Sequence, residues 1–263
     1  MELLWIGHSG ILIRSSNVLI AIDPFLTGWF DWLGKRNFYH GKSPWIGTST
    51  KNANFLESYG KKLTAIAITH KHGDHLDLPF IEKILKENSI VKIYAPKTVI
   101  KSIKSSIVKN LSFEISKSRF VTVKSNREYE IVSNEEKLKF LIIPLTQLLG
   151  RIQKNKVAYL IINEKTTNLI GLLHSGDSHT IKPLKPYLQS ITHLLTWSSK
   201  DWLNELVKYL PNMNLKFIWW IHWENFSPGN FHCNQDIKRI MAEFSNYNIP
   251  QGVLPFNHFV KLK

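Results

Sequence analysis

The chain has 263 residues, of which 43% are hydrophobic and 21% charged, as is typical of a globular protein with a substantial core. No stretch approaches the roughly 20 consecutive apolar residues of a membrane span, and the first residues do not resemble a signal peptide. Cys233 is the single cysteine, which excludes an intrachain disulfide and a thiolate-rich metal cage. Because the chain has no pair of cysteines to form a disulfide, the reducing cytoplasm is its expected location.

Basic residues outnumber acidic ones. Lys and Arg number 34 and Asp and Glu 20, which gives a formal net charge of +14. A field of this sign attracts anionic ligands. Much of the excess is lysine scattered along the chain, however, so a solvated surface accounts for most of it.

The first part of the chain is expected to form strands, followed by a long irregular segment. Strands are predicted over residues 2–7, 11–16 and 17–22, and Asp23-Pro24 ends the third. Residues 27–60 are rich in Gly, Asn, Ser and Trp, and such a long loop in a compact domain is more often functional than incidental. Its aromatic side chains are candidates for the wall of an apolar pocket or for contact with a lipid or partner protein.

The remaining pattern alternates strands and helices. Residues 63–69 form a continuous apolar strand, and residues 78–89 have helical spacing, with Asp77 as N-cap and Pro79 in the first turn. Further strands are predicted at 91–96, 119–123, 127–132, 138–144, 157–163, 167–176, 193–197, 217–223 and 258–263, and further helices at 97–110, 199–211 and 234–246. Two strand-rich halves, about 1–145 and 156–263, predict two sheets packed face to face with helices outside, in one domain over 1–263.

A cluster of histidines and aspartates follows the strand at 63–69: His70, His72, Asp74, His75 and Asp77. In an extended segment alternate side chains share a side, so His70 and His72 point the same way. Gly73 allows a tight turn, after which Asp74 and His75 point differently. Imidazole and carboxylate suit zinc, manganese or iron(II), and the cluster therefore predicts a site for one or two divalent cations.

The order His70-x-His72-x-Asp74-His75 resembles the signature of the metallo-β-lactamase superfamily. Other markers of that family appear in order: Asp23 in "AIDPF", Asp177 in "LLHSGDSH" and His222 in "FIWWIHWENF". The stretches "WIGHSGILI", "DPFL" and "HWENFSP" are most similar to the branch containing ascorbate-6-phosphate lactonase and N-acyl-phosphatidylethanolamine phospholipase D. The resemblance covers about residues 3 to 225. It implies an α+β fold, a four-layer αβ/βα sandwich of two mixed β-sheets flanked by helices.

The resemblance also implies a set of metal ligands: His70, His72, Asp74, His75, Asp177 and His222. The first two would bind one ion, while Asp74, His75 and His222 would bind a second, with Asp177 bridging. Asp23 would lie behind the ligands and orient them through hydrogen bonds. The expected metal is Zn²⁺, with Mn²⁺ or Fe²⁺ as alternatives.

One position departs from the family pattern. A further histidine is expected after the strand that ends in "LIIP", but Thr146 and Gln147 stand there. An amide oxygen is a poorer zinc ligand than imidazole, so both a two-ion site and a single-ion site stay open. His8 and His179 are candidates to compensate, and His179 is expected to face the pocket.

The implied activity is hydrolysis by a metal-activated hydroxide of a small anionic ester, phosphodiester, lactone or amide. Asp74 or His8 would supply a proton to the leaving group. The expected partner is a small anionic substrate or a phospholipid-like molecule, and a homo-oligomer stays open. No stable nucleic-acid complex is expected, since nucleases of the family generally carry an inserted domain for which this chain has little room. The alternative is an altered family member that binds an anionic ligand or partner without catalysis.

Overall fold

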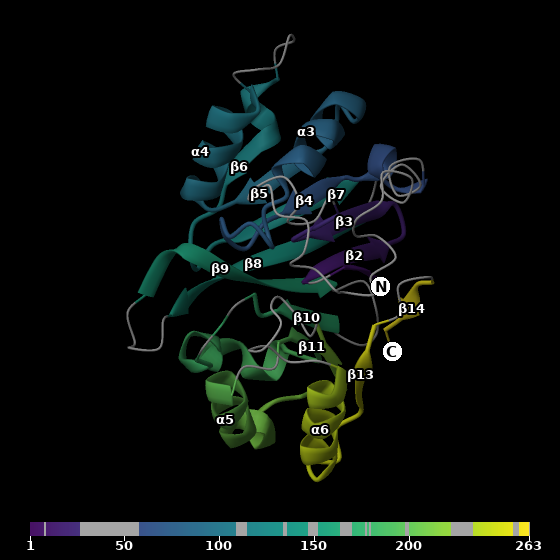
Figure 1. Ribbon diagram of the computed structural model, residues 1–263, viewed down its shortest axis with the longest axis vertical. Coiled ribbons are helices and arrows are strands. Elements are labelled where there is room, and N and C mark those ends of the chain that lie inside the picture. Colours follow the sequence, from purple (N-terminus) through teal and green to yellow (C-terminus); the bar gives the residue numbers. More distant parts are fainter. Residues whose placement is uncertain are drawn as a thin grey trace.

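A computed structural model of the protein shows two β-sheets packed face to face, with helices on their outer faces (Figure 1). It describes residues 1–7, 9–26, 58–108, 115–133, 136–146, 152–163, 170–176, 178, 180–197, 200–221, 234–254 and 258–262. Within these ranges each sheet has seven strands. Two mixed sheets flanked by helices confirm the predicted fold class.

The first sheet has the strand order β14-β1-β2-β3-β4-β5-β6. Its strands are β1 (Glu2–Gly7), β2 (Gly10–Ser15), β3 (Val18–Ile22), β4 (Ala65–Ala67), β5 (Lys92–Ala95), β6 (Phe120–Thr122) and β14 (Val260–Lys261). Pairing is antiparallel from β14 to β3 and parallel from β3 to β6. The carboxyl ends of β3, β4, β5 and β6 therefore lie along one edge.

The second sheet has the order β13-β12-β11-β10-β9-β8-β7. Its strands are β7 (Glu128–Ser133), β8 (Glu136–Thr146), β9 (Ile152–Asn163), β10 (Ile170–His174), β11 (His193–Thr196), β12 (Phe217–Trp220) and β13 (Gln251–Val253). Pairing is antiparallel from β7 to β10 and parallel from β10 to β13. The second sheet thus repeats the pattern of the first, with parallel strands that also end together.

Three apolar layers hold this arrangement together. One lies between the sheets and includes Trp5, Ile20, Phe140 and Tyr159. A second lies between the first sheet and α3 (Leu78–Glu87) and α4 (Lys97–Ser106). A third lies under α5 (Lys200–Tyr209), α6 (Asn234–Ser245) and the 3₁₀ segment η4 (Lys182–Ser190). Strands such as β3 and β4 are buried on both faces, which explains their unbroken apolar sequences.

The helices begin and end for local reasons. The Asp77 carboxylate caps α3 by accepting from the backbone N–H of Phe80 at 3.0 Å, as predicted, and Pro79 lies in the first turn. Ile81, Ile84 and Leu85 face the sheet. Short 3₁₀ turns complete the described elements: η1 (Gly60–Lys62), η3 (Lys117–Arg119) and η5 (Leu210–Asn212).

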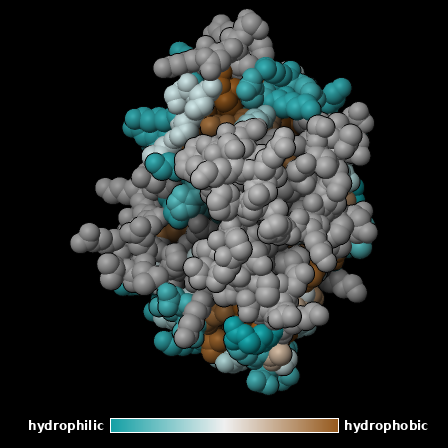
Figure 2. All heavy atoms as spheres, in the orientation of Figure 1, coloured by the Kyte–Doolittle hydropathy of each residue, from teal (hydrophilic) through white to brown (hydrophobic). Residues whose placement is uncertain are grey.

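The two ends of the molecule are largely hydrophilic. In the space-filling view, hydrophilic residues gather over the α3–α4 layer and over the α5–α6 layer, where the helices turn their outer faces to solvent (Figure 2). No helix in the described ranges is long and apolar enough to cross a bilayer.

Several predicted boundaries differ from the observed ones. The strand predicted at 63–69 is shorter, Ala65–Ala67, while those predicted at 138–144 and 157–163 are longer because β8 and β9 pair beyond them. β13 and η4 were not predicted. The chain passes from one sheet to the other between β6 and β7, earlier than the predicted division at 145–156, and β14 returns to the first sheet.

Candidate metal centre

The carboxyl ends of β4 and β10 meet where the two sheets converge. Beyond β4 the chain continues through Thr69 into the histidine cluster, and the Thr69 carbonyl accepts a hydrogen bond of 3.1 Å from Val157 N of β9. Beyond β10, Gly176 packs so closely that a Cβ there would lie 3.4 Å from Thr69 Cβ. Gly176 has a φ of 53°, in the left-handed region that favours glycine. Segments far apart in the chain therefore meet at Thr69.

Asp23 is the acceptor at the centre of this region. It follows β3, its side chain is fully buried, and its carboxylate lies within hydrogen-bond distance of three groups. Oδ1 accepts from Thr69 N at 2.7 Å, and Oδ2 accepts from Thr69 Oγ1 at 2.6 Å. Oδ2 also lies 2.7 Å from His75 Nδ1. One buried carboxylate is thus linked to both ends of the segment 69–75.

The protonation of Asp23 follows from its neighbours. Burial by itself would raise the pKa of the Asp23 carboxyl, but the positive charge that the His75 ring carries when protonated and the hydrogen bond from that ring hold the pKa below the ordinary value. Asp23 is therefore ionised at neutral pH and can only accept hydrogen bonds.

An ionised Asp23 sets the tautomers of two histidines. Because Asp23 can only accept, Nδ1 of His75 carries the hydrogen. Thr69 Oγ1 donates its one hydrogen to Asp23. In its contact with His70 Nδ1, at 3.0 Å, the Thr69 oxygen must therefore accept the hydrogen bond, so His70 also carries its hydrogen on Nδ1. In both neutral rings the lone pair then lies on Nε2, which is shielded from solvent in both residues. This is the tautomer of a metal-binding histidine whose other nitrogen is held by a carboxylate or hydroxyl.

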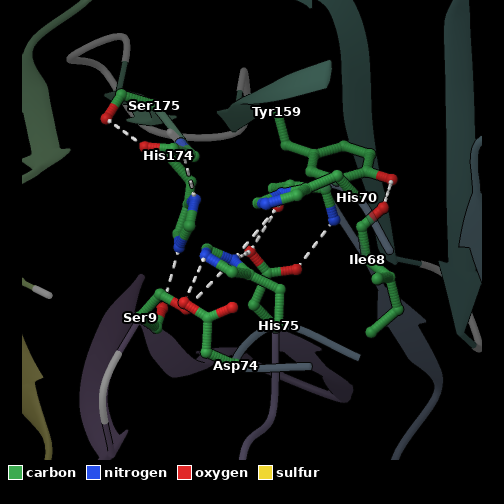
Figure 3. A network of polar contacts seen from close by, with 11 residues as sticks. Ser9, Ile68, His70, Asp74, His75, Tyr159, His174 and Ser175 are labelled. Atoms are coloured by element: carbon green, nitrogen blue, oxygen red, sulfur yellow. Dashed lines mark hydrogen bonds and ion pairs between the residues drawn. The ribbon is translucent and has the colours of Figure 1, made fainter. Parts of the chain in front are cut away.

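Three of the candidate ligands, His70, Asp74 and His75, lie close together (Figure 3). The ring centroids of His70 and His72 are 4.3 Å apart, and those of His70 and His75 are 4.1 Å apart. Asp74 Oδ2 lies 3.5 Å from His75 Nε2. Two ligand atoms of one tetrahedral zinc ion are roughly 3.3 Å apart, so the spacing of this pair and the chemistry of the donors fit a shared divalent cation.

The turn between β1 and β2 passes over this site. Ser9 is buried, and its Oγ lies 3.2 Å from His75 Nδ1. The turn requires Gly10, because a Cβ there would lie 2.7 Å from the Gly7 carbonyl oxygen and 2.9 Å from that of Asp23. The chain therefore brings Ser9 against the pair formed by Asp23 and His75.

Tyr159 supports the site from the second sheet. Its hydroxyl lies 2.9 Å from the carbonyl oxygens of both Ile68 and Tyr94. Burial, together with the negative charge of Asp23, raises the pKa of Tyr159 well above its usual value, so the hydroxyl remains a donor. Tyr159 thus ties β9 to Ile68, just before the histidine cluster, and to β5.

The structure brings together Asp23, His70, His72, Asp74 and His75 among the predicted site residues. The others lie outside the described residues: His8, Gln147, Asp177, His179 and His222, as does most of the loop 27–60. Among the described side chains, no group of three or more His, Cys, Asp and Glu forms a complete metal site. The assignment of ligands therefore stays a prediction.

Four supporting residues have no clear signal in the sequence: Ser9, Thr69, Tyr159 and His174. Thr69 lies beside the histidine cluster, and a hydroxyl next to a candidate ligand is a weak signal for a supporting hydrogen bond. Ser9 follows a candidate residue, His8. Tyr159 and His174 lie within apolar strand patterns, which by themselves indicate residues of the sheet core. Their contacts depend on tertiary packing.

Comparison with known proteins agrees with this geometry. Residues 22–215 match the model of the family described as the beta-lactamase superfamily domain. A metal-dependent hydrolase from Brucella anthropi is 34% identical over 76 residues, which cover 29% of this chain and 24% of that relative. The match thus spans about a quarter of the relative's length.

Two solved structures have a similar fold. A metallo hydrolase from the archaeon Ignicoccus hospitalis has a TM-score of 0.67 at 15% identity, with 100% of this chain and 99% of that chain covered. An isothiocyanate hydrolase from Delia radicum gut bacteria has a TM-score of 0.66 at 14% identity, with both chains fully covered (100%). Since the family model matches most of the chain and the fold agrees, this protein belongs to the β-lactamase superfamily.

Proposed function

We propose that the protein is a metal-dependent hydrolase with its reaction centre at the histidine cluster after β4. One observation carries the proposal: the buried carboxylate of Asp23 holds His75 directly, and His70 through Thr69, in the tautomer with the ring lone pair on Nε2. The metal dependence of the Brucella relative and of the Ignicoccus structure supports the proposal.

Four described residues would hold the cation: His70, His72, Asp74 and His75. Asp177 and His222, from the ends of β10 and β12, are proposed to complete the ligand set. A bound divalent cation supplies Lewis acidity, which makes water nucleophilic near neutral pH and stabilises negative charge on the substrate. The Asp74 carboxylate lies beside His75 in this cluster, and it is suited to accept a proton and return it to the leaving group. Asp23 keeps both rings oriented through the reaction.

We further propose a small anionic substrate, with zinc as the metal. The net charge of +14 favours anions in general. Phosphodiesters, phosphorylated lactones, esters and phospholipid-like amides all suit attack by water at phosphorus or carbon. The resemblance to the lactonase and phospholipase branch favours the phosphate-bearing members of this set.

The experiment is elemental analysis of protein purified without added metal, combined with turnover of a phosphodiester, a lactone and an amide. The wild type is expected to retain divalent metal and to hydrolyse at least one substrate. His75→Ala is expected to lose metal and to reduce turnover to background, while the exposed His258→Ala serves as a matched control and should retain both. A folded wild type without metal or turnover would favour the alternative of an anion-binding protein and would contradict the proposal. Retained turnover in His75→Ala would also contradict it.

A further inference from the structure

His174 connects the second sheet to the candidate metal centre in the first. It ends β10 and is fully buried. Its Nε2 lies 2.9 Å from the carbonyl oxygen of Ser9, and its Nδ1 accepts a hydrogen bond of 3.2 Å from the backbone N–H of Gly176. The Ser9 hydroxyl in turn lies 3.2 Å from His75 Nδ1 (Figure 3). A single residue, Ser9, therefore touches both histidines.

The two bonds of His174 define its tautomer. A backbone N–H can only donate, so Nδ1 of His174 carries a lone pair, and a carbonyl oxygen can only accept, so Nε2 carries the hydrogen. This arrangement is the reverse of that in His70 and His75. His174 could bind a cation only by breaking one of these two bonds, and its geometry is that of a support and not of a ligand.

The position of Ser9 has little freedom. The turn that contains it lies between Gly7 and Gly10, and the backbone of Gly10 approaches the Asp23 carbonyl so closely that no Cβ fits. Ser9 has an exposed fraction of 1%. Any movement of its carbonyl therefore also moves its hydroxyl relative to His75.

We propose that His174 is a positioning residue that holds Ser9, and through it His75, in the geometry needed for metal binding. The inference rests on the proposed metal-dependent function and adds a support for His75 beside Asp23. The same hydrogen bond fixes the end of β10 against the turn between β1 and β2.

Two substitutions separate the bonds of His174. His174→Gln places an amide N–H near the position of Nε2 and can still donate to Ser9. His174→Asn places an amide oxygen near the position of Nδ1 and can still accept from Gly176, but it does not reach Ser9. Each variant buries one amide and retains one of the two contacts of His174, so the pair shows which contact the metal site depends on. The proposal requires His174→Gln to behave like the wild type and His174→Asn to differ.

The first readout is the ¹⁵N NMR signal of the imidazole rings in the metal-free protein. In the wild type, His174 should be neutral with its hydrogen on Nε2. This measurement uses the wild type alone, so it does not depend on the folding of a variant. The ring signals of His75 should shift in His174→Asn and stay in place in His174→Gln. A His174 that carries hydrogen on Nδ1 would overturn the proposal, and so would equal His75 signals in the two variants.

The second readout is zinc affinity, measured by competition with a chromophoric chelator. His174→Asn should lower the affinity about tenfold, at the lower end of the effect of residues that orient metal ligands, and His174→Gln should stay within about threefold of the wild type. Equal affinities in both variants would contradict the proposal.

A double-mutant cycle tests the route through Ser9. In a Ser9→Ala background the hydroxyl is already absent, so His174→Asn should add little further loss of affinity, and full additivity would contradict the inference. If the wild type binds no zinc, the proposed function fails, whereas the NMR readout in the metal-free protein still decides whether His174 positions His75.

Discussion

At the scale of single residues, Asp23 determines how the candidate ligands are presented. It leaves β3 with a φ of 44°, in the left-handed region that is costly for a residue with a side chain. Its N–H is bonded to the Ala67 carbonyl, and its carboxylate accepts from Thr69 and His75. These bonds offset the backbone strain. Strain of this kind collects at functional sites, because only surrounding contacts can maintain it.

Replacing Asp23 by Asn should weaken zinc binding about 10- to 100-fold, the usual cost of losing a residue that orients a metal-bound histidine. The amide is uncharged, and if its nitrogen faces His75 it cannot accept from Nδ1. Chelator competition measures the effect, and Asp201→Asn, which neutralises an exposed carboxylate of α5, provides the matched control. Equal zinc affinities in the two variants would show that Asp23 does not orient the ligands.

The sequence reveals only the local part of this site. His70, His72, Asp74 and His75 are recognisable because they lie within six positions, and Asp23 follows a clear strand. The contacts of Ser9 with His75 and His174 join residues 66 and 165 positions apart. No spacing rule predicts such pairs, since they depend on how the two sheets pack.

At the scale of elements, Asp77 connects α3 to the segment that follows Asp23. One carboxylate oxygen caps the helix at Phe80 N, and the other accepts from the buried Leu26 N at 2.8 Å. The cap was predictable from the order of residues around Pro79. The bond to Leu26 was not, because Leu26 is 51 positions away.

Replacing Asp77 by Ala should lower the free energy of unfolding by about 2 kcal/mol, since a helix cap is lost and a buried donor at Leu26 loses its acceptor. Urea denaturation measures this loss. Asp77→Asn, which retains one acceptor oxygen, should lose clearly less. If the two variants were equally stable, the carboxylate would have no such role.

His193 in β11 introduces a pH dependence. Burial, with the charges of Lys216 and the N-terminal amine, lowers the pKa of His193 from its ordinary value of 6.5 to about 4. The unfolded chain therefore takes up a proton in this range while the folded chain does not. The stability due to neutral His193 is complete above about pH 6.5 and decreases as the pH falls towards 4.

His193→Gln should accordingly reduce the loss of stability between pH 7 and pH 5, measured by urea denaturation at both values. His258→Gln, at an exposed position, should leave that loss unchanged. An unaltered pH dependence in His193→Gln would contradict a buried neutral imidazole.

Element boundaries were harder to predict than element types. β8 and β9 extend past their apolar runs because each continues to pair with the other. β13 has only three residues and includes Gly252, and η4 includes two prolines, so neither has a clear periodic pattern. Tertiary pairing decides these cases.

At the scale of the whole molecule, the two sheets have the same arrangement, with antiparallel strands followed by parallel strands. The candidate metal centre lies where parallel strands of both sheets end, so its geometry depends on the packing of the sheets. The layers were predictable from the alternation of apolar strands and amphipathic helices. The change of sheet between β6 and β7 was not predictable. β5 belongs to the first sheet and β8 to the second, but both have the same kind of apolar strand sequence.

Tyr159 tests the link between the sheets. Tyr159→Phe keeps the ring in the core but removes the donor to the carbonyls of Ile68 and Tyr94, so the free energy of unfolding should fall by about 1–3 kcal/mol. Thermal denaturation measures the change. Tyr129→Phe removes a hydroxyl whose hydrogen bonds to the backbone of Lys124 and Thr122 lie at an exposed position, and it should have a much smaller effect. Equal losses would mean that the Tyr159 hydroxyl does not connect the sheets.

The histidine cluster after β4 is proposed to hold a divalent cation. Anomalous X-ray diffraction from crystals grown with zinc tests it most directly. A peak is predicted at roughly 2 Å from both His75 Nε2 and Asp74 Oδ2, the distance of a zinc–ligand bond. A well-ordered site without anomalous density, or with zinc bound only elsewhere on the protein, would contradict the account.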